Sequence, residues 1–125
     1  MIVPVVRVTN MARSVDFYTR VLDFAHVGTW SLTGPTMDDP SFTLLTRDGS
    51  QLHLSSHGGD GVVGQKLTVL VTDIDALHAG FVARGLDQAH RTESPIHLGP
   101  TDQTWGTREF CADDPDGNGV TFMQR

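Results

Sequence analysis

The segment Val8-Thr9-Asn10-Met11 continues into Arg13-Ser14-Val15-Asp16-Phe17-Tyr18, and its pattern determines the architecture expected for the chain. A second stretch, Val71-Thr72-Asp73-Ile74 opening into Ala76-Leu77-His78-Ala79-Gly80-Phe81, has the same pattern. Each combines a short apolar strand, a capping residue and an amphipathic helix. They start 63 residues apart, from residue 8 to residue 71, which is half of the 125-residue chain. This spacing predicts two copies of one supersecondary unit that complete each other's core, with the functional site between them.

Each copy also contains three strand-like segments after its helix. In the first copy a strand precedes a helix capped by Asn10, and the strands are expected at 3–8, 24–32, 41–46 and 51–55. In the second copy Asp73 caps the helix and Gly85 ends it, and the strands are expected at 67–71, 88–93, 107–112 and 119–124. The order βαβββ therefore occurs twice. The predicted fold class is α+β, with two βαβββ repeats forming curved mixed sheets around a cleft.

The whole chain, residues 1–125, is predicted to be a single domain. Repeat one covers about residues 1–57, a link covers about 58–65, and repeat two covers about 66–125. The link contains Gly59-Asp60-Gly61-Val62-Val63-Gly64, which matches a dinucleotide-binding motif by letter. That motif needs a strand before it and a helix after it, whereas a strand is expected here from residue 67. We therefore interpret the segment as a flexible link.

Composition and charge exclude several classes of function. The net charge of −6 argues against binding to the phosphate backbone of nucleic acid and is compatible with a cationic or neutral ligand. The first ten residues have neither a basic start nor a long apolar core, which predicts no signal peptide and no membrane span. The single cysteine, Cys111, cannot form an internal disulfide and fits a reducing compartment. We expect a cytoplasmic protein that binds no nucleic acid and no membrane.

Alternation along two strands identifies residues that face away from the helices. In Leu52-His53-Leu54 the leucines are expected to pack under a helix, which turns His53 to the opposite face of the sheet. In Val120-Thr121-Phe122 the same rule turns Thr121 away from the helix. If two half-sheets close on each other, these two residues line a cleft.

Aromatic residues complete the candidate site. Trp30, Phe42 and Trp105 fall in strands or loops expected to rim the cleft, and aromatic walls suit a flat, partly apolar molecule. For Phe42, ordinary core packing is an equally good interpretation. Arg108 and Glu109 are adjacent on a predicted strand, so only one of them can face the cleft. The pair can instead form a structural bridge to other elements.

Metal and nucleophile chemistry has little support in the sequence. His53 and His57 are the closest pair of histidines, and a zinc or iron site would need two further ligands at matching depth. The remaining histidines are scattered along the chain: His26, His78, His90 and His97. No nucleophile with a paired histidine and no carboxylate dyad can be identified from the spacing. We therefore assign no catalytic residue.

Taken together, the motifs resemble the vicinal oxygen chelate superfamily, which includes glyoxalase I, extradiol dioxygenases and bleomycin resistance proteins. The resemblance runs through the whole chain. It rests on Ser14-Val15-Asp16-Phe17-Tyr18 with Val21-Leu22-Asp23-Phe24, on Leu52-His53-Leu54-Ser55-Ser56-His57, on Val71-Thr72-Asp73-Ile74-Asp75-Ala76-Leu77, and on Trp105-Gly106-Thr107-Arg108-Glu109-Phe110 with Asp114-Pro115-Asp116-Gly117-Asn118. The last of these is most similar to the bleomycin resistance branch and is the most specific.

The resemblance also implies where a metal would be held. In the metal enzymes of the superfamily the ligands come from the first and last strands of each half, and those positions fall near Val3, His53, Lys66 and Thr121. Only His53 could bind a metal, because valine and threonine are poor ligands and a lysine ammonium repels a cation. A shift of one residue in the strand register would offer Gln65 in place of Lys66, but the site would still have too few metal ligands. We expect no cofactor, with a divalent metal held by His53 as the alternative.

For function, the resemblance implies a binding protein more than an enzyme. Bleomycin resistance proteins are dimers that sequester the drug in clefts at the subunit interface. We expect a homodimer, with or without exchange of the N-terminal strand near Pro4, that sequesters a small aromatic ligand of bleomycin type and confers antibiotic resistance. The expected ligand-binding residues are Trp30, Phe42, His53, Trp105, Arg108 and Thr121. The alternatives are a metal-dependent glyoxalase-like lyase or ring-cleaving dioxygenase, and a protein with a vestigial cleft that acts through its dimer surface.

Overall fold

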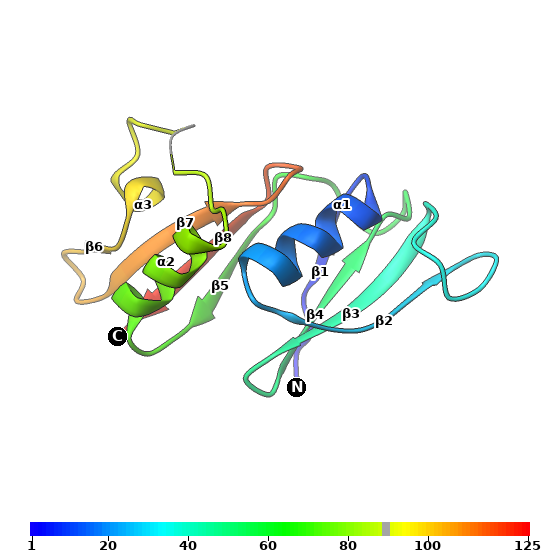
Figure 1. The fold of residues 1–125 in the computed structure, drawn as a ribbon, viewed down its shortest axis with the longest axis horizontal. Helices are drawn as coiled ribbons and strands as arrows, with labels where there is room; N and C mark the ends of the chain where they lie inside the picture. The colour runs from blue at the N-terminus through cyan, green and yellow to red at the C-terminus, as the bar shows by residue number, and fades with distance from the viewer. Residues whose placement is uncertain (89–90) are drawn as a thin grey trace. The chain divides into compact units, whose positions relative to one another are not determined.

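The chain forms two compact units, each built around one four-stranded mixed sheet (Figure 1). A computed structural model describes residues 1–88 and 91–125. The first unit comprises Met1–Gln65 with Asp114–Asn118, and the second comprises Lys66–Asp113 with Gly119–Arg125. Each sheet belongs to one βαβββ repeat, so the predicted α+β fold class is confirmed.

The first unit has the strand order β1-β4-β3-β2. Its elements are β1 (Val5–Arg7), α1 (Met11–Asp16), the π-helical turn η1 (Phe17–Val21), β2 (Ala25–Ser31), β3 (Ser41–Arg47) and β4 (Ser50–Ser55). β1 runs parallel to β4, and the other neighbouring strands are antiparallel. Asp48 and Gly49 both have positive φ and join β3 to β4 in a tight hairpin.

Asn10 caps α1, as the sequence predicts. Its Oδ1 accepts a hydrogen bond from the backbone N–H of Arg13 at 3.0 Å. Four apolar residues that recur at helical spacing in this segment are buried: Met11, Val15, Tyr18 and Leu22. They cover one face of the first sheet, where Leu45, Leu52 and Leu54 are buried too.

The turn at residues 114–118 folds into the first unit and ties distant segments together. Asp114 accepts a hydrogen bond from the Tyr18 hydroxyl at 2.9 Å, across 96 residues of chain. Asp114 also accepts from the backbone N–H of Asn118 at 2.9 Å. The Asn118 side chain in turn accepts from the backbone N–H of Gln65 at 3.0 Å. This turn therefore secures both the helical segment and the end of the link.

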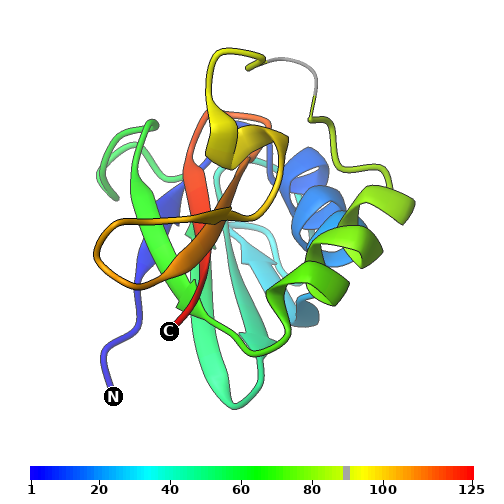
Figure 2. The same cartoon turned by 90° about the vertical axis from the view of Figure 1, so that its left-hand side faces the viewer.

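The second unit has the strand order β5-β8-β7-β6. Its elements are β5 (Lys66–Leu70), α2 (Ile74–Ala83), α3 (Pro95–Leu98), β6 (Thr101–Asp102), β7 (Arg108–Asp113) and β8 (Gly119–Gln124). α2 packs on one face of this sheet (Figure 2). The ring centroid of its Phe81 lies 6.0 Å from that of Phe110 and 5.0 Å from that of Phe122. Phe81 meets these two rings edge-on, whereas Phe110 and Phe122 stack on each other at 5.1 Å, and the three rings form the core of the unit.

The start of α2 differs from the expectation. Asp73 precedes the helix, but it adopts a left-handed conformation with φ of 49° and its side chain makes no capping hydrogen bond. Gln124 replaces it, because its Oε1 accepts from the backbone N–H of Ile74 at 2.8 Å. The helix end is as predicted, since Gly85 follows the last turn with φ of 104°.

The strand predicted at 88–93 is not found where the structure describes that segment. Residues 91–93 form a turn, and residues 89–90, which include His90, lie outside the described residues. Pro95 begins α3, as proline is favoured in the first turn of a helix, and the strand beside β7 is the short β6. Among the described residues, no helix has the length and apolar character needed to cross a membrane.

Candidate functional site

Three of the predicted ligand-binding residues share one face of the first sheet. Trp30 on β2 stands opposite Phe42 on β3, and His53 on β4 lies diagonally from Phe42. The rings of Phe42 and His53 form an edge-on contact with centroids 4.8 Å apart. This face is opposite the one that α1 covers, because the alternate residues Leu52 and Leu54 are buried on the helix side. The predicted orientation of His53 is therefore confirmed.

The Trp30 indole lies along its own strand, over Gly28. A Cβ added to Gly28 would stand 2.6 Å from Cη2 and 2.8 Å from Cζ2 of the indole, far inside normal contact distance. Only glycine leaves room for this orientation, and a glycine within a strand often marks such a close approach. Trp30 is 51% exposed, so the ring offers a flat apolar surface. Gly28 was not among the predicted site residues, although its place two residues before Trp30 on the same strand indicates a close approach of the indole.

Glu109 is a buried carboxylate on the face of the second sheet that is turned away from α2. The residue is only 6% exposed. Its Oε2 accepts hydrogen bonds from the indole N–H of Trp105 at 3.3 Å and from the hydroxyl of Thr107 at 2.6 Å. Trp105 itself is 67% exposed, so Glu109 anchors a surface indole. The strand pattern identifies Glu109 only as the neighbour of Arg108 and does not predict its contact with Trp105.

Arg108 faces the other way, as alternation on β7 requires. Its guanidinium binds Asp75 at the start of α2 at 2.8 Å and Asp102 on β6 at 3.2 Å. The hydrogen bond with Asp75 raises the pKa of Arg108 and lowers the pKa of Asp75. Arg108 also lines a hollow of about 370 Å³ beside the β6–β7 hairpin. The residue thus forms a structural bridge, and its contact with a ligand stays a prediction.

Thr121 lies on the expected face of β8 but is enclosed. It pairs directly with Cys111 on β7 and is only 1% exposed. The six predicted residues therefore fall into three places: Trp30, Phe42 and His53 on one face of the first sheet, Trp105 and Thr121 on or beside one face of the second, and Arg108 on the opposite face of the second.

The ligand positions that the resemblance implies do not supply a metal site. In the first sheet β1 places Val5, not Val3, beside His53. In the second sheet β5 places Thr68, not Lys66, beside Thr121. Valine has no donor atom, and threonine hydroxyls are poor ligands for zinc or iron. The residues at these positions therefore do not fit a glyoxalase-type metal.

A family model relates this fold to known proteins. Residues 2–122 match the model described as the Glyoxalase/Bleomycin resistance protein/Dioxygenase superfamily. The chain belongs to this superfamily. The match spans nearly the whole chain of this glyoxalase-superfamily protein, and it confirms the resemblance that the motifs show.

Solved structures of similar proteins share the fold. The bleomycin-binding protein from bleomycin-producing Streptomyces verticillus, complexed with copper(II)-bleomycin, is 25% identical, with 97% of this chain and 92% of that chain covered and a TM-score of 0.66. A bleomycin-binding protein complexed with bleomycin is 20% identical, with coverages of 100% and 98% and a TM-score of 0.71. The bleomycin resistance determinant encoded on the transposon Tn5 is 18% identical, with coverages of 100% and 97% and a TM-score of 0.73. No curated protein matches this chain.

Proposed function

We propose that this protein binds and sequesters a small aromatic compound of bleomycin type, without a metal, and thereby confers resistance to it. The observation that carries the proposal is the aromatic wall formed by Trp30, Phe42 and His53. The Trp30 indole lies flat over Gly28, and Phe42 and His53 are in ring contact. A wall that is ordered before binding holds a planar ring with a small loss of conformational entropy.

Charge favours a ligand with a cationic group. The net charge of −6 attracts cations to the protein. Glu109 supplies a carboxylate next to the exposed indole of Trp105. Within the second unit, we propose Trp105, Glu109 and Thr121 as separate ligand contacts, and prefer Glu109 to Arg108, because two carboxylates already bind Arg108.

Two relatives support this ligand class. A bleomycin-binding protein was solved with bleomycin, and the Streptomyces verticillus protein was solved with copper(II)-bleomycin. Sequestration needs tight stoichiometric binding and no catalytic group. A lyase or dioxygenase would need metal donors besides His53, and its strand neighbour Val5 supplies none. The proposal includes a cytoplasmic homodimer, with or without an exchanged N-terminal strand.

A thermal-shift screen of chelator-treated protein tests the proposal against bleomycin, other aromatic antibiotics and divalent metals. We expect concentration-dependent stabilisation by a bleomycin-type compound, since a ligand at about 100 times its Kd adds roughly 2.7 kcal/mol. Trp30→Ala should reduce this shift. Leu32→Ala is the matched control, because Leu32 is exposed and follows β2 directly. If a metal alone stabilises the wild-type protein and this stabilisation disappears in His53→Ala, the sequestration proposal is wrong and a metal-dependent enzyme is favoured.

A further inference from the structure

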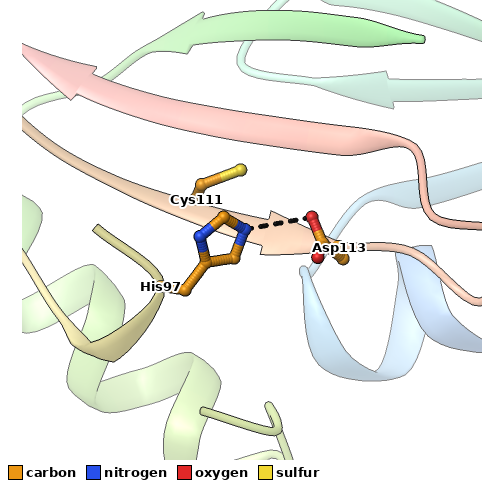
Figure 3. Close-up of side chains that lie close together, drawn as sticks. All are labelled: His97, Cys111 and Asp113. Carbon is orange, nitrogen blue, oxygen red and sulfur yellow. Dashed lines mark hydrogen bonds and ion pairs between the residues drawn. The ribbon is translucent and has the colours of Figure 1, made fainter. Parts of the chain in front are cut away.

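Three side chains that the proposed function does not use lie together in the second unit (Figure 3). Cys111 and Asp113 are two residues apart on β7, so their side chains leave the same face, and His97 reaches them from α3. The three ligand atoms all lie within 4.8 Å of one another. His97 Nε2 is 3.1 Å from Asp113 Oδ1. His97 and Cys111 are buried, with exposures of 9% and 6%.

We propose that His97, Cys111 and Asp113 form a binding site for a divalent metal of the zinc class. Thiolate, imidazole and carboxylate are the ligands that zinc uses, at metal–ligand distances of about 2.0–2.3 Å. In a tetrahedral site, two such ligand atoms lie roughly 3.5 Å apart. The His97–Asp113 pair is already near this spacing, and small side-chain rotations bring in the thiol. The sulfur and imidazole donors favour zinc over magnesium or calcium.

Hydrogen bonds already orient two of the three ligands. Ser94 Oγ lies 2.7 Å from His97 Nδ1, so it can accept the proton there and leave Nε2 directed at the cluster. Arg91 Nε binds the other carboxylate oxygen of Asp113, Oδ2, at 2.8 Å. At known zinc sites, partners of this kind fix the histidine tautomer and make the ligand more basic.

The surroundings of the thiol also suit a bound metal. A Cβ added to Gly119 would lie 3.5 Å from Cys111 Sγ and 3.9 Å from Asp113 Oδ1, so glycine keeps this side of the cluster open. The buried hydroxyl of Thr121, which pairs with Cys111 across the sheet, has no hydrogen-bond partner among the described residues. A metal-bound thiolate would accept its hydrogen and satisfy this group.

The thiolate and the carboxylate together neutralise a dication, which lowers the cost of burying the charges. Arg91 adds a positive charge through its ion pair with Asp113, but its side chain is 47% exposed, so water and salt screen that charge. Burial raises the pKa of the Cys111 thiol, and Asp113 adds to this, whereas the Thr121 hydroxyl, Lys66 and Arg91 act against it. Metal binding must therefore displace the thiol proton, and the affinity should rise with pH.

Cobalt(II) titration of the full chain tests the site, because a cobalt-bound thiolate gives an intense near-ultraviolet charge-transfer band. The chain has one cysteine, so the band can come only from Cys111. We expect one cobalt per chain, a thiolate band that zinc displaces, and tighter binding at about pH 8 than at about pH 6. Wild-type protein that shows no thiolate band at saturating cobalt overturns the proposal without any variant.

Variants locate the site. Cys111→Ser should abolish the band, and Ser94→Ala should weaken binding by about 10- to 100-fold. His53→Ala is the control for cobalt binding, because it removes a histidine from the first sheet. It should change neither the thiolate band nor the affinity for cobalt. Circular dichroism checks that each variant folds. Metal binding lost in His53→Ala but kept in Cys111→Ser also overturns the proposal. Both results are independent of bleomycin binding to the aromatic wall.

Discussion

The indole of Trp30 occupies the space over Gly28 that a side chain at residue 28 would fill, since a Cβ there would stand 2.6 Å from the ring. Gly28 therefore determines how Trp30 is presented. On the neighbouring strands, the rings of Phe42 and His53 support each other at 4.8 Å. Two features therefore fix the aromatic wall: Gly28 has no side chain and leaves room for the Trp30 indole, and the rings of Phe42 and His53 contact each other.

Gly28→Ala should displace the indole and weaken the binding of an aromatic ligand by about tenfold, or about 1.4 kcal/mol. The Trp105→Phe background leaves Trp30 as the single tryptophan, so its emission reports both the displacement and the binding. Gly58→Ala is the matched control, because a Cβ there meets nothing within 4 Å. Wild-type affinity in Gly28→Ala would show that the orientation of Trp30 is not used.

Tyr18→Phe should lower the free energy of unfolding by about 1–2 kcal/mol. The substitution removes the buried hydrogen bond from the Tyr18 hydroxyl to Asp114, while the backbone N–H groups of Asp116 and Asn118 still bind that carboxylate. Urea denaturation measures the change. An unchanged midpoint would mean that this bond does not contribute to holding the 114–118 turn.

Stability should fall as the pH rises above about 9. Burial raises the pKa of Cys111 above its ordinary 9.0 and the pKa of Tyr18 above its ordinary 10.0. The folded protein therefore keeps protons that the unfolded chain releases, so the free energy of unfolding decreases with increasing pH in this range. Denaturation at neutral and alkaline pH should show a shallower decline in Cys111→Ser and in Tyr18→Phe. Slopes equal to that of the wild type would contradict this explanation.

Glu109→Gln should affect ligand binding, whereas Arg108→Gln should affect thermal stability. Glu109→Gln should weaken the binding of a cationic aromatic ligand by about tenfold, because it neutralises the carboxylate beside Trp105. Arg108→Gln should leave binding unchanged and lower the melting temperature, because it breaks the bridge to Asp75 and Asp102. Calorimetric titration and thermal denaturation of the two variants separate these effects. If Arg108→Gln loses ligand binding and Glu109→Gln does not, Arg108 and not Glu109 contacts the ligand.

Local rules predicted the parts of this fold that depend on local sequence. In Leu52-His53-Leu54 and Val120-Thr121-Phe122 the side-chain directions follow from the two-residue period of a strand, and the structure agrees. The Asn10 cap depends on a contact with Arg13, three residues away, and was predicted correctly for the same reason.

Contacts between distant segments could not be predicted in this way. Gln124, not Asp73, satisfies the start of α2, and it lies 50 residues from Ile74 in the sequence. The cluster of His97, Cys111 and Asp113 depends on α3, which brings His97 to β7 from the segment between the strands expected at 88–93 and 107–112. Such contacts depend on tertiary packing, which strand and helix periodicity do not specify.

Metal-free binding of a bleomycin-type compound on the aromatic wall is measured by isothermal titration calorimetry. Chelator-treated wild-type protein is titrated with metal-free bleomycin, and Trp30→Ala and Leu32→Ala are titrated in the same way. We predict saturable binding of one ligand per chain with a Kd of about 1 µM or lower, weakened about tenfold in Trp30→Ala and unchanged in Leu32→Ala. No binding by the wild-type protein, or equal affinity in the wild type and Trp30→Ala, would contradict the account.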